Sequence, residues 1–229
     1  MRTLLVAAAL LAAPLTSLPS AQAAERPVVV ELFTSQGCSS CPPADAHLRQ
    51  LAQERRDVLP LAFHVTYWNS LGWRDPYSLA AATERQAAYG SRLGETSFTP
   101  QAIVDGRTSL IGSRRSEVDA AIAEAKSQVR TAVPLAIHRA GAGLNLTVGA
   151  GSGQGRLLLI GFDREHTTAI GRGENGGRRL TEANIVRSLR EVGSWRGAAL
   201  TLAEAAPAGE DAALILQAPD GRILGAARL

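Results

Sequence analysis

Two cysteines, Cys38 and Cys41, are the residues whose types and spacing most directly predict a chemistry. They are the only cysteines in the sequence, and a disulfide between residues three apart closes a very short loop. Such a loop removes little entropy from the unfolded chain, so the pair is a poor structural staple. Thiol–disulfide exchange or metal binding therefore accounts for the pair better than stabilisation does.

The local sequence around the pair favours redox chemistry. A β-rich segment, Pro27–Thr34, precedes the polar loop Ser35–Cys41, and apolar residues follow at helical spacing over Pro42–Arg56. A C-x-x-C motif between a strand and a helix is typical of a redox site. The N-terminus of a helix favours a thiolate, which is the attacking species in exchange. We expect Cys38 to be the more exposed sulfur and to attack a substrate, and Cys41 to resolve the mixed disulfide.

Alternating strands and helices must position this loop in the first half of the chain. After the first helix, the patterns predict a strand at Leu59–Trp68, a helix at Ser78–Tyr89, strands at Gln101–Val104 and Thr108–Ile111, and a helix at Ser113–Val129. Asp105-Gly106, between the two short strands, is a hairpin signal. The resulting order β-α-β-α-β-β-α is that of the thioredoxin fold, an α/β fold with helices on the faces of the sheet.

The second half is predicted to be rich in β-strands separated by glycine turns. The candidate strands are Leu135–His138, Leu144–Val148, Arg156–Phe162, Ala198–Leu202, Ala212–Gln217 and Arg222–Ala227. For Ile185–Trp195 a helical spacing competes with the β-rich surroundings, and we favour a strand. Many short strands with glycine turns indicate a small antiparallel sandwich or barrel. We therefore expect a thioredoxin-like domain over residues 25–131 and a β-rich domain over residues 132–229.

Residues 1–24 predict export. Arg2 precedes an apolar run from Leu4 to Ala13, and small residues follow up to Ala23 and Ala24, which is the pattern of a secretory signal peptide cleaved near that point. We expect a periplasmic or secreted protein without a membrane span after cleavage. The formal net charge is only +3 at pH 7, and no basic cluster stands out, so nucleic acid is not an expected partner.

Thr99-Pro100 stands directly before the predicted strand Gln101–Val104. In thioredoxin folds a cis-proline at this place packs against the cysteine pair and offers its backbone to a bound substrate. Given the predicted order of elements, we expect Pro100 to be cis and part of the catalytic site, and Thr99 to contact the substrate. The alternative is an ordinary trans proline, which strands tolerate at their first residue.

Glu31, Tyr67 and Trp68 are candidates for tuning the site. Glu31 interrupts the apolar first strand, and a carboxylate buried beneath the cysteines could accept the proton of Cys41 during resolution. The alternative is a glutamate that faces solvent or pairs with an arginine. Tyr67 and Trp68 end the second strand at the edge of the sheet that carries the cysteines, where they could bind a peptide or fill the core.

Four stretches of the sequence carry a resemblance to a known family: VELFTSQGCSSCPPAD, HVTYWNSLGWRDPYS, FTPQAIVDG and RGENGGRRL. There the chain resembles the bacterial exported thioredoxin-like family catalogued as domain of unknown function 1223 (DUF1223). The resemblance implies a thioredoxin-like fold with a β-rich C-terminal extension, and it implies no substrate. The site also resembles those of thioredoxins, with two departures. Gly37 replaces their tryptophan, and Ser39-Ser40 replaces their Gly-Pro, so the direction of electron flow stays open.

These observations predict an exported thiol–disulfide oxidoreductase that acts on protein thiols and disulfides, forms mixed disulfides with its substrate and redox partner, and needs no cofactor. One alternative is a copper- or zinc-handling protein with His64 as the nearest additional ligand, although no second close pair of ligands accompanies the cysteines. Another is a binding module with a redox-inactive pair. We interpret the glycine-rich loop Arg172–Arg178 as a solvent-exposed turn, with folding over the cysteine site or binding of a partner as the alternatives.

Overall fold

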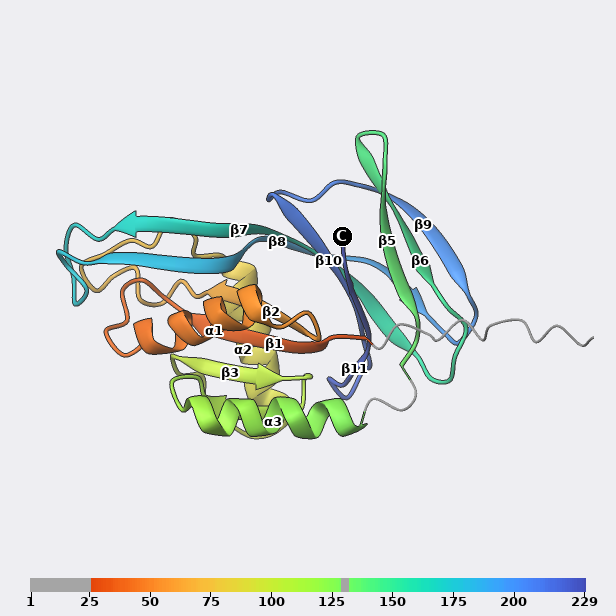
Figure 1. The fold of residues 1–229 in the computed structure, drawn as a ribbon, viewed down its shortest axis with the longest axis horizontal. Coiled ribbons are helices and arrows are strands. Elements are labelled where there is room, and N and C mark those ends of the chain that lie inside the picture. The colour runs from red at the N-terminus through yellow and green to blue at the C-terminus, as the bar shows by residue number, and fades with distance from the viewer. Residues whose placement is uncertain (1–25, 129–131) are drawn as a thin grey trace, which may run out of the picture.

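The computed structural model describes residues 26–128 and 132–229 (Figure 1). Its first half contains, in chain order, β1 (Val28–Thr34), α1 (Pro42–Glu54), β2 (Val58–His64), α2 (Ala80–Leu93), β3 (Gln101–Val104), β4 (Thr108–Ile111) and α3 (Arg115–Gln128). This is the order that the sequence predicts. The hairpin between β3 and β4 turns at Asp105 and Gly106, which both have positive φ, as a tight hairpin turn requires.

The second half consists of strands. They are β5 (Leu135–Ala140), β6 (Gly143–Val148), β7 (Gly155–Ala169), β8 (Arg179–Trp195), β9 (Leu200–Ala205), β10 (Asp211–Gln217) and β11 (Ile223–Arg228). The strand predicted at Ile185–Trp195 is confirmed as the second part of β8. Both β7 and β8 are longer than expected, and together they form one long antiparallel hairpin.

One continuous sheet joins the two halves of the chain. Its strand order is β11-β10-β7-β8-β2-β1-β3-β4, and a separate three-stranded sheet has the order β5-β6-β9. The junction lies between β2 and β8, where Ala62 pairs with Ile185 in parallel and the Asn184 side chain donates to the Pro60 carbonyl at 2.7 Å. The sequence predicted a separate sandwich or barrel, and this expectation needs correction. Strands β7, β8, β10 and β11 extend the first sheet, and β8 covers the edge of β2, whereas β5, β6 and β9 form the second sheet.

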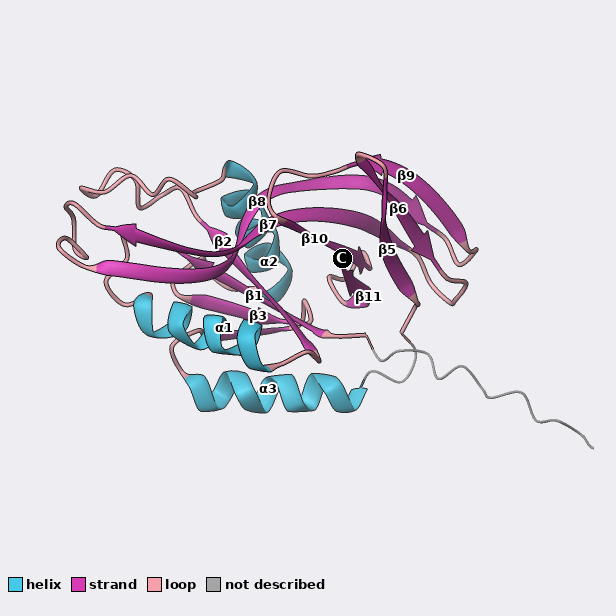
Figure 2. Ribbon diagram, turned by 45° about the horizontal axis from the view of Figure 1, so that its top comes forward, coloured by secondary structure: helices cyan, strands magenta, loops and turns pink. Residues whose placement is uncertain are grey.

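The layers of the fold follow from alternating side chains along β1 (Figure 2). Val28, Val30 and Leu32 face α1 and α3, and Val29 and Phe33 face α2. In the C-terminal half, apolar residues of the three-stranded sheet pack against the faces of β7 and β10. A helix-covered sheet therefore continues into a two-layered β region.

Within the described residues, no helix is both long enough and apolar enough to cross a bilayer. The predicted signal peptide, with its cleavage point near Ala23 or Ala24, lies outside the described residues.

Candidate active site

The disulfide between Cys38 and Cys41 occupies the loop that leads from β1 into α1, and the two Cα atoms are 5.4 Å apart. The helix begins at Pro42, which makes Cys41 its N-cap residue. Proline suits this first helical position because its missing N–H would have no partner there. The local geometry therefore follows from the sequence, and it holds the two cysteines together at the start of the helix.

Both cysteines are completely buried in this oxidised form, with 0% of each residue exposed. The expectation that Cys38 would be the more exposed is therefore wrong, because other segments cover both residues. The exposed residues of the loop are Ser39 and Ser40. The Ser40 Oγ lies 3.3 Å from the Cys38 Sγ, so the Cys38 sulfur is in contact with an exposed side chain.

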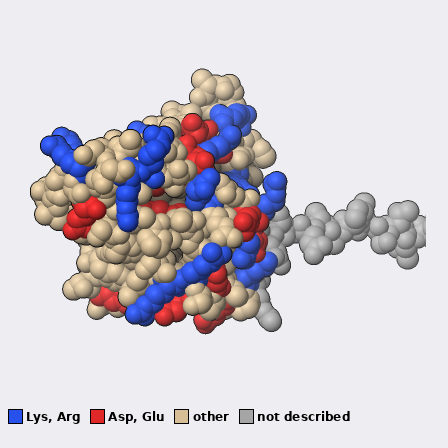
Figure 3. Space-filling model, turned by 60° about the vertical axis from the view of Figure 1, so that its left-hand side comes forward, with Lys and Arg blue, Asp and Glu red and all other residues tan. Residues whose placement is uncertain are grey.

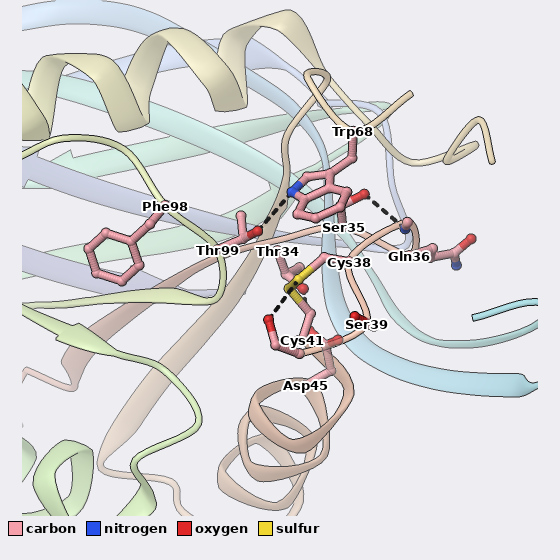
Figure 4. The surroundings of a disulfide bond; sticks show 12 residues. Thr34, Ser35, Gln36, Cys38, Ser39, Cys41, Asp45, Trp68, Phe98 and Thr99 are labelled. Carbon is pink, nitrogen blue, oxygen red and sulfur yellow. Dashed lines mark hydrogen bonds between the residues drawn. A yellow bond between two sulfur atoms is a disulfide. The ribbon is translucent and has the colours of Figure 1, made fainter. Parts of the chain in front are cut away.

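Trp68 and Thr99 lie beside the disulfide, as Figure 4 shows. The Trp68 indole N–H donates to the Thr99 hydroxyl at 2.8 Å. The peptide bond between Thr99 and Pro100 is cis, as predicted. Pro100 is buried and lies near the start of α1. A Cβ added to Gly112 would stand 3.3 Å from the Ala44 Cβ and 3.4 Å from the Pro100 Cβ, so Gly112 packs against both residues.

Gly37 allows Trp68 to approach the loop Ser35–Cys41, called the cysteine loop below. A Cβ on Gly37 would stand 3.3 Å from the Trp68 Cβ. The loop after β2 thus places Trp68 next to Gly37, the position at which thioredoxins have a tryptophan. Tyr67 is 42% exposed, and its hydroxyl donates to Gln86, which in turn donates to the Phe98 carbonyl. Tyr67 and Trp68 both link this loop to the segment that ends in Thr99-Pro100.

Glu31 lies on the face of the sheet opposite α1. Its carboxylate is fully buried and accepts hydrogen bonds from Arg85 and Tyr89 of α2. Arg85 also donates to the Gln217 side chain in β10, at 3.2 Å. The structure therefore gives Glu31 an arginine partner on the α2 side and does not bring it to the α1 face, where the helix that follows the cysteines packs.

A different carboxylate, Asp45, lies on the α1 face beside the cysteine loop (Figure 4). It follows Cys41 by one helical turn, and its backbone N–H donates to the Cys41 carbonyl at 3.1 Å. One carboxylate oxygen accepts a hydrogen bond from Thr34 at 2.7 Å, and the other is buried without a partner among the described residues. Burial raises the pKa of Asp45 to about 8, and the charge of Glu182 adds to this effect. Asp45 therefore holds a proton near neutral pH.

His64, Asp75 and Glu182 form a buried cluster with Asp45. The His64 Nδ1 lies 2.7 Å from an Asp75 oxygen, and its Nε2 lies 3.7 Å from a Glu182 oxygen. Burial alone would lower the pKa of His64, but the charges of Asp75 and Glu182 outweigh it and raise the pKa to about 9. Gln36 donates its backbone N–H to Asp75 and its side-chain amide to Glu182, which ties the cluster to the cysteine loop.

The buried proton on Asp45 predicts that Asp45→Asn stabilises the protein as the pH rises. Between pH 4 and pH 8 the folded chain keeps a proton that the unfolded chain releases, so Asp45 lowers stability progressively across this interval. In urea denaturation we expect the advantage of the variant over the natural chain to be about 4 kcal/mol larger at pH 8 than at pH 5. An equal difference at both pH values would contradict this assignment.

The loop Arg172–Arg178, at the tip of the β7–β8 hairpin, reaches the cysteine loop. Asn175 is only 1% exposed, and its amide donates to the carbonyls of Gln36 and Cys38 at 3.0 and 2.9 Å. The Glu174 carboxylate accepts the Ser39 N–H at 3.1 Å. The interpretation of this loop as a plain exposed turn is therefore wrong, because it contacts residues that lie far away in the sequence.

A family model described as "Protein of unknown function (DUF1223)" matches residues 29–217. The chain belongs to the DUF1223 family. This DUF1223 chain is similar to the crystal structure of protein AGR_C_4864 from Agrobacterium tumefaciens, with 35% identity and a TM-score of 0.78 over 88% of this chain and 93% of that one. It also shares a fold with HBP35 of Porphyromonas gingivalis, with 12% identity and a TM-score of 0.59 over 90% of this chain and 75% of that one. No curated protein matches the chain.

The described part of the DUF1223 chain contains no group of three or more histidine, cysteine or acidic side chains arranged to hold a metal ion. Cys38 and Cys41 are bonded to each other, and His64, the nearest additional ligand considered from the sequence, is engaged with Asp75. The geometry of these residues therefore adds no support to the metal-handling alternative.

Sequence reasoning missed four polar residues around the site: Asp45, Asp75, Glu182 and Asn175. A signal for Asp45 was present in the DUF1223 sequence, because it follows Cys41 by four residues and therefore lies on the same side of the helix. Asp75 and Asn175 lie in stretches that resemble the family, and folding of the Asn175 loop over the cysteines was an alternative interpretation, but no local pattern gives either residue a role at the site. Glu182 lies on a strand that is distant in sequence, and no signal marks it.

Proposed function

We propose that this DUF1223 chain is an exported thiol–disulfide oxidoreductase, periplasmic or secreted, with a thioredoxin fold over residues 25–131 and a β-rich domain over residues 132–229. The observation that carries the proposal is the Cys38–Cys41 disulfide at the turn between β1 and α1, on the same side of the sheet as Pro100. The strand order β2-β1-β3-β4 supports the fold assignment, because β1 is parallel to β2 and antiparallel to β3.

In this proposal Cys38 attacks and Cys41 resolves. Contact with the exposed Ser40 supports the attacking role for Cys38, whereas Cys41 caps the helix and its carbonyl accepts the Ala44 and Asp45 amides. Because both cysteines are buried, a substrate must displace part of their cover before it reaches the Cys38 sulfur.

The exchange begins in the reduced protein, when the Cys38 thiolate attacks one sulfur of a substrate disulfide. A mixed disulfide forms, and the substrate's other sulfur leaves as a thiolate. The Cys41 thiol then gives its proton to Asp45, and the resulting thiolate attacks the Cys38 sulfur. The Cys38–Cys41 disulfide forms, and the second substrate sulfur leaves as a thiolate, so that two electrons have passed to the substrate. The reverse sequence oxidises a substrate dithiol.

Asp45 supports this proton transfer better than Glu31 does. Asp45 lies one turn after Cys41, has a buried oxygen without a partner in the described part of the chain, and changes its charge near pH 8. Glu31 instead has a hydrogen-bonded arginine partner on the α2 side. A group that exchanges a proton near the working pH is suited to general acid–base catalysis.

Trp68, Thr99 and Tyr67 supply the proposed contact surface for a substrate peptide. Trp68 and Thr99 lie beside the disulfide, and Tyr67 presents an exposed aromatic ring on the same loop. Leu71 on that loop is 56% exposed, which adds apolar surface to the loop. This combination suits an extended protein segment with an apolar side chain beside its cysteine.

The proposal predicts that Cys41→Ser traps partners and that the natural pair exchanges with glutathione. Without Cys41 a mixed disulfide on Cys38 cannot be resolved, so affinity-purified Cys41→Ser should carry partner proteins that a reductant releases. The matched control Cys38→Ser should carry none. For the natural chain, equilibration in glutathione buffers should give a reduction potential within about −120 to −270 mV.

Two results would reject the proposed function. One is an equal absence of trapped partners in Cys41→Ser and Cys38→Ser, which would favour a redox-inactive binding module. The other is a reduction potential far below about −300 mV, which is the range of inert structural disulfides.

A further inference from the structure

The tip of the β7–β8 hairpin, residues 170–178, is built to contact the cysteine loop. Backbone bonds between Ile170 and Arg178 and between Gly177 and Ile170 close the turn. The Arg178 guanidinium donates to the Asn175 side-chain oxygen at 3.0 Å, which leaves the Asn175 NH₂ group to point at its two acceptors. The tip therefore presents an oriented amide to the loop.

The glycines of the tip explain its close fit. Gly173 has φ +78, and a Cβ there would stand 3.1 Å from the Trp73 Cβ in the loop after β2. Trp73 donates its indole N–H to the Gln36 side chain, at 3.1 Å. The tip, the loop after β2 and the cysteine loop therefore pack against one another. Figure 1 shows the β7–β8 hairpin extending above α1, on the left of the view.

Asn175 and Glu174 make three hydrogen bonds to the backbone of the cysteine loop. The Asn175 amide donates to the Gln36 and Cys38 carbonyls, and the Glu174 carboxylate accepts the Ser39 N–H. A thiolate at Cys38 is stabilised by backbone N–H groups near the start of α1. Glu174 occupies one of these donors and adds a negative charge beside it, so it opposes ionisation of Cys38.

We propose that the β7–β8 tip sets the reactivity of Cys38, with Asn175 as a positioning residue that holds the Cys38 backbone and Glu174 as the charge that restrains its thiolate. The inference rests on the proposed function. Positive and negative side chains are interspersed on the face shown in Figure 3.

The first test is Glu174→Gln, which keeps the hydrogen-bond acceptor and removes the charge. Glu174 is exposed, so the variant should fold normally. Removing the charge should lower the pKa of Cys38, measured from the pH dependence of alkylation by iodoacetamide. It should also stabilise the reduced form by about two- to fivefold in the glutathione equilibrium. The effect should shrink at high salt, because exposed charges are screened.

The second test is Asn175→Ala, with the rate of disulfide reduction by a water-soluble phosphine as the readout. Loss of two hydrogen bonds should raise the population in which the loop opens, and so the reduction rate, by about tenfold. Thr167→Ala is the matched control, because Thr167 pairs with Thr181 on the exposed part of the same hairpin. A thermal unfolding curve for each variant shows whether the fold is retained.

The inference is overturned if Glu174→Gln and Asn175→Ala both match Thr167→Ala in the glutathione equilibrium and in the phosphine rate. That result is distinct from failure of the proposed function. A chain with no trapped partners could still show both shifts, and a chain that traps partners could show neither.

Discussion

Asp45→Asn should slow the resolution of a mixed disulfide on Cys38 by about 100-fold above pH 8, where the Asp45 carboxyl of the natural chain is ionised. The variant keeps the size of the side chain and an acceptor for Thr34, but it cannot take the proton of Cys41. Without that acceptor, Cys41 must ionise into water from a buried position, which burial disfavours. The measurement is a stopped-flow assay in which a coloured aromatic thiol, first attached to Cys38, is released by Cys41.

The pH profile separates this role from a structural one. The pKa of Asp45 is raised to about 8 by burial, and the carboxylate form needed for resolution therefore grows as the pH passes through 8. The natural chain should show an inflection near that pH, and Asp45→Asn should lack it. Glu31→Gln is the matched control on the α2 side. If Glu31→Gln removes the inflection and Asp45→Asn leaves it unchanged, the proton acceptor is Glu31, as the sequence first suggested.

Arg85→Met should lower the free energy of unfolding by about 3–5 kcal/mol, because it leaves the Glu31 carboxylate buried without its compensating charge. Burial by itself would lower the pKa of Arg85, but the Glu31 charge outweighs it and the pKa is raised, so Arg85 stays charged throughout the accessible pH range. Urea denaturation at pH 7 measures the loss. The position of the pair on the α2 face predicts little change in the reduction potential of the cysteines.

Two controls define this result. Replacing both partners, as Glu31→Leu with Arg85→Met, should cost less than Arg85→Met alone, because no unpaired charge stays buried. Arg49→Gln removes a partly exposed pair with Glu165 and should cost less than about 1 kcal/mol. If Arg85→Met costs no more than Arg49→Gln, the buried pair does not hold α2 on the sheet as described.

Local sequence signals predicted those parts of the site that nearby residues determine. The strand before Cys38, the helix start at Pro42 and the cis bond before Pro100 all depend on residues that are close in sequence or on the order of the elements. The hairpin at Asp105 followed from turn chemistry that is equally local.

The errors concern contacts between distant segments. Cys38 is buried because its surroundings include Trp68 and the hairpin tip. The position of a residue in a loop does not show whether distant segments cover it. The role first considered for Glu31 assumed which face of the strand carried the cysteines, whereas Arg85 and Tyr89 hold it on the other face. The lengths of β7 and β8, and the place of β8 beside β2, depend on pairing that no local pattern encodes.

The junction of β2 and β8 constrains the order in which the chain can assemble. Asn175 and the Cys38 carbonyl that it binds are 137 residues apart, so the first half is synthesised well before the hairpin tip that contacts it. Contacts of such separation form slowly. Until they form, the chain presents both thiols to any oxidant around it and an unpaired β2 edge to its neighbours. Pro60 on that edge supplies no N–H, which limits mispairing during this interval.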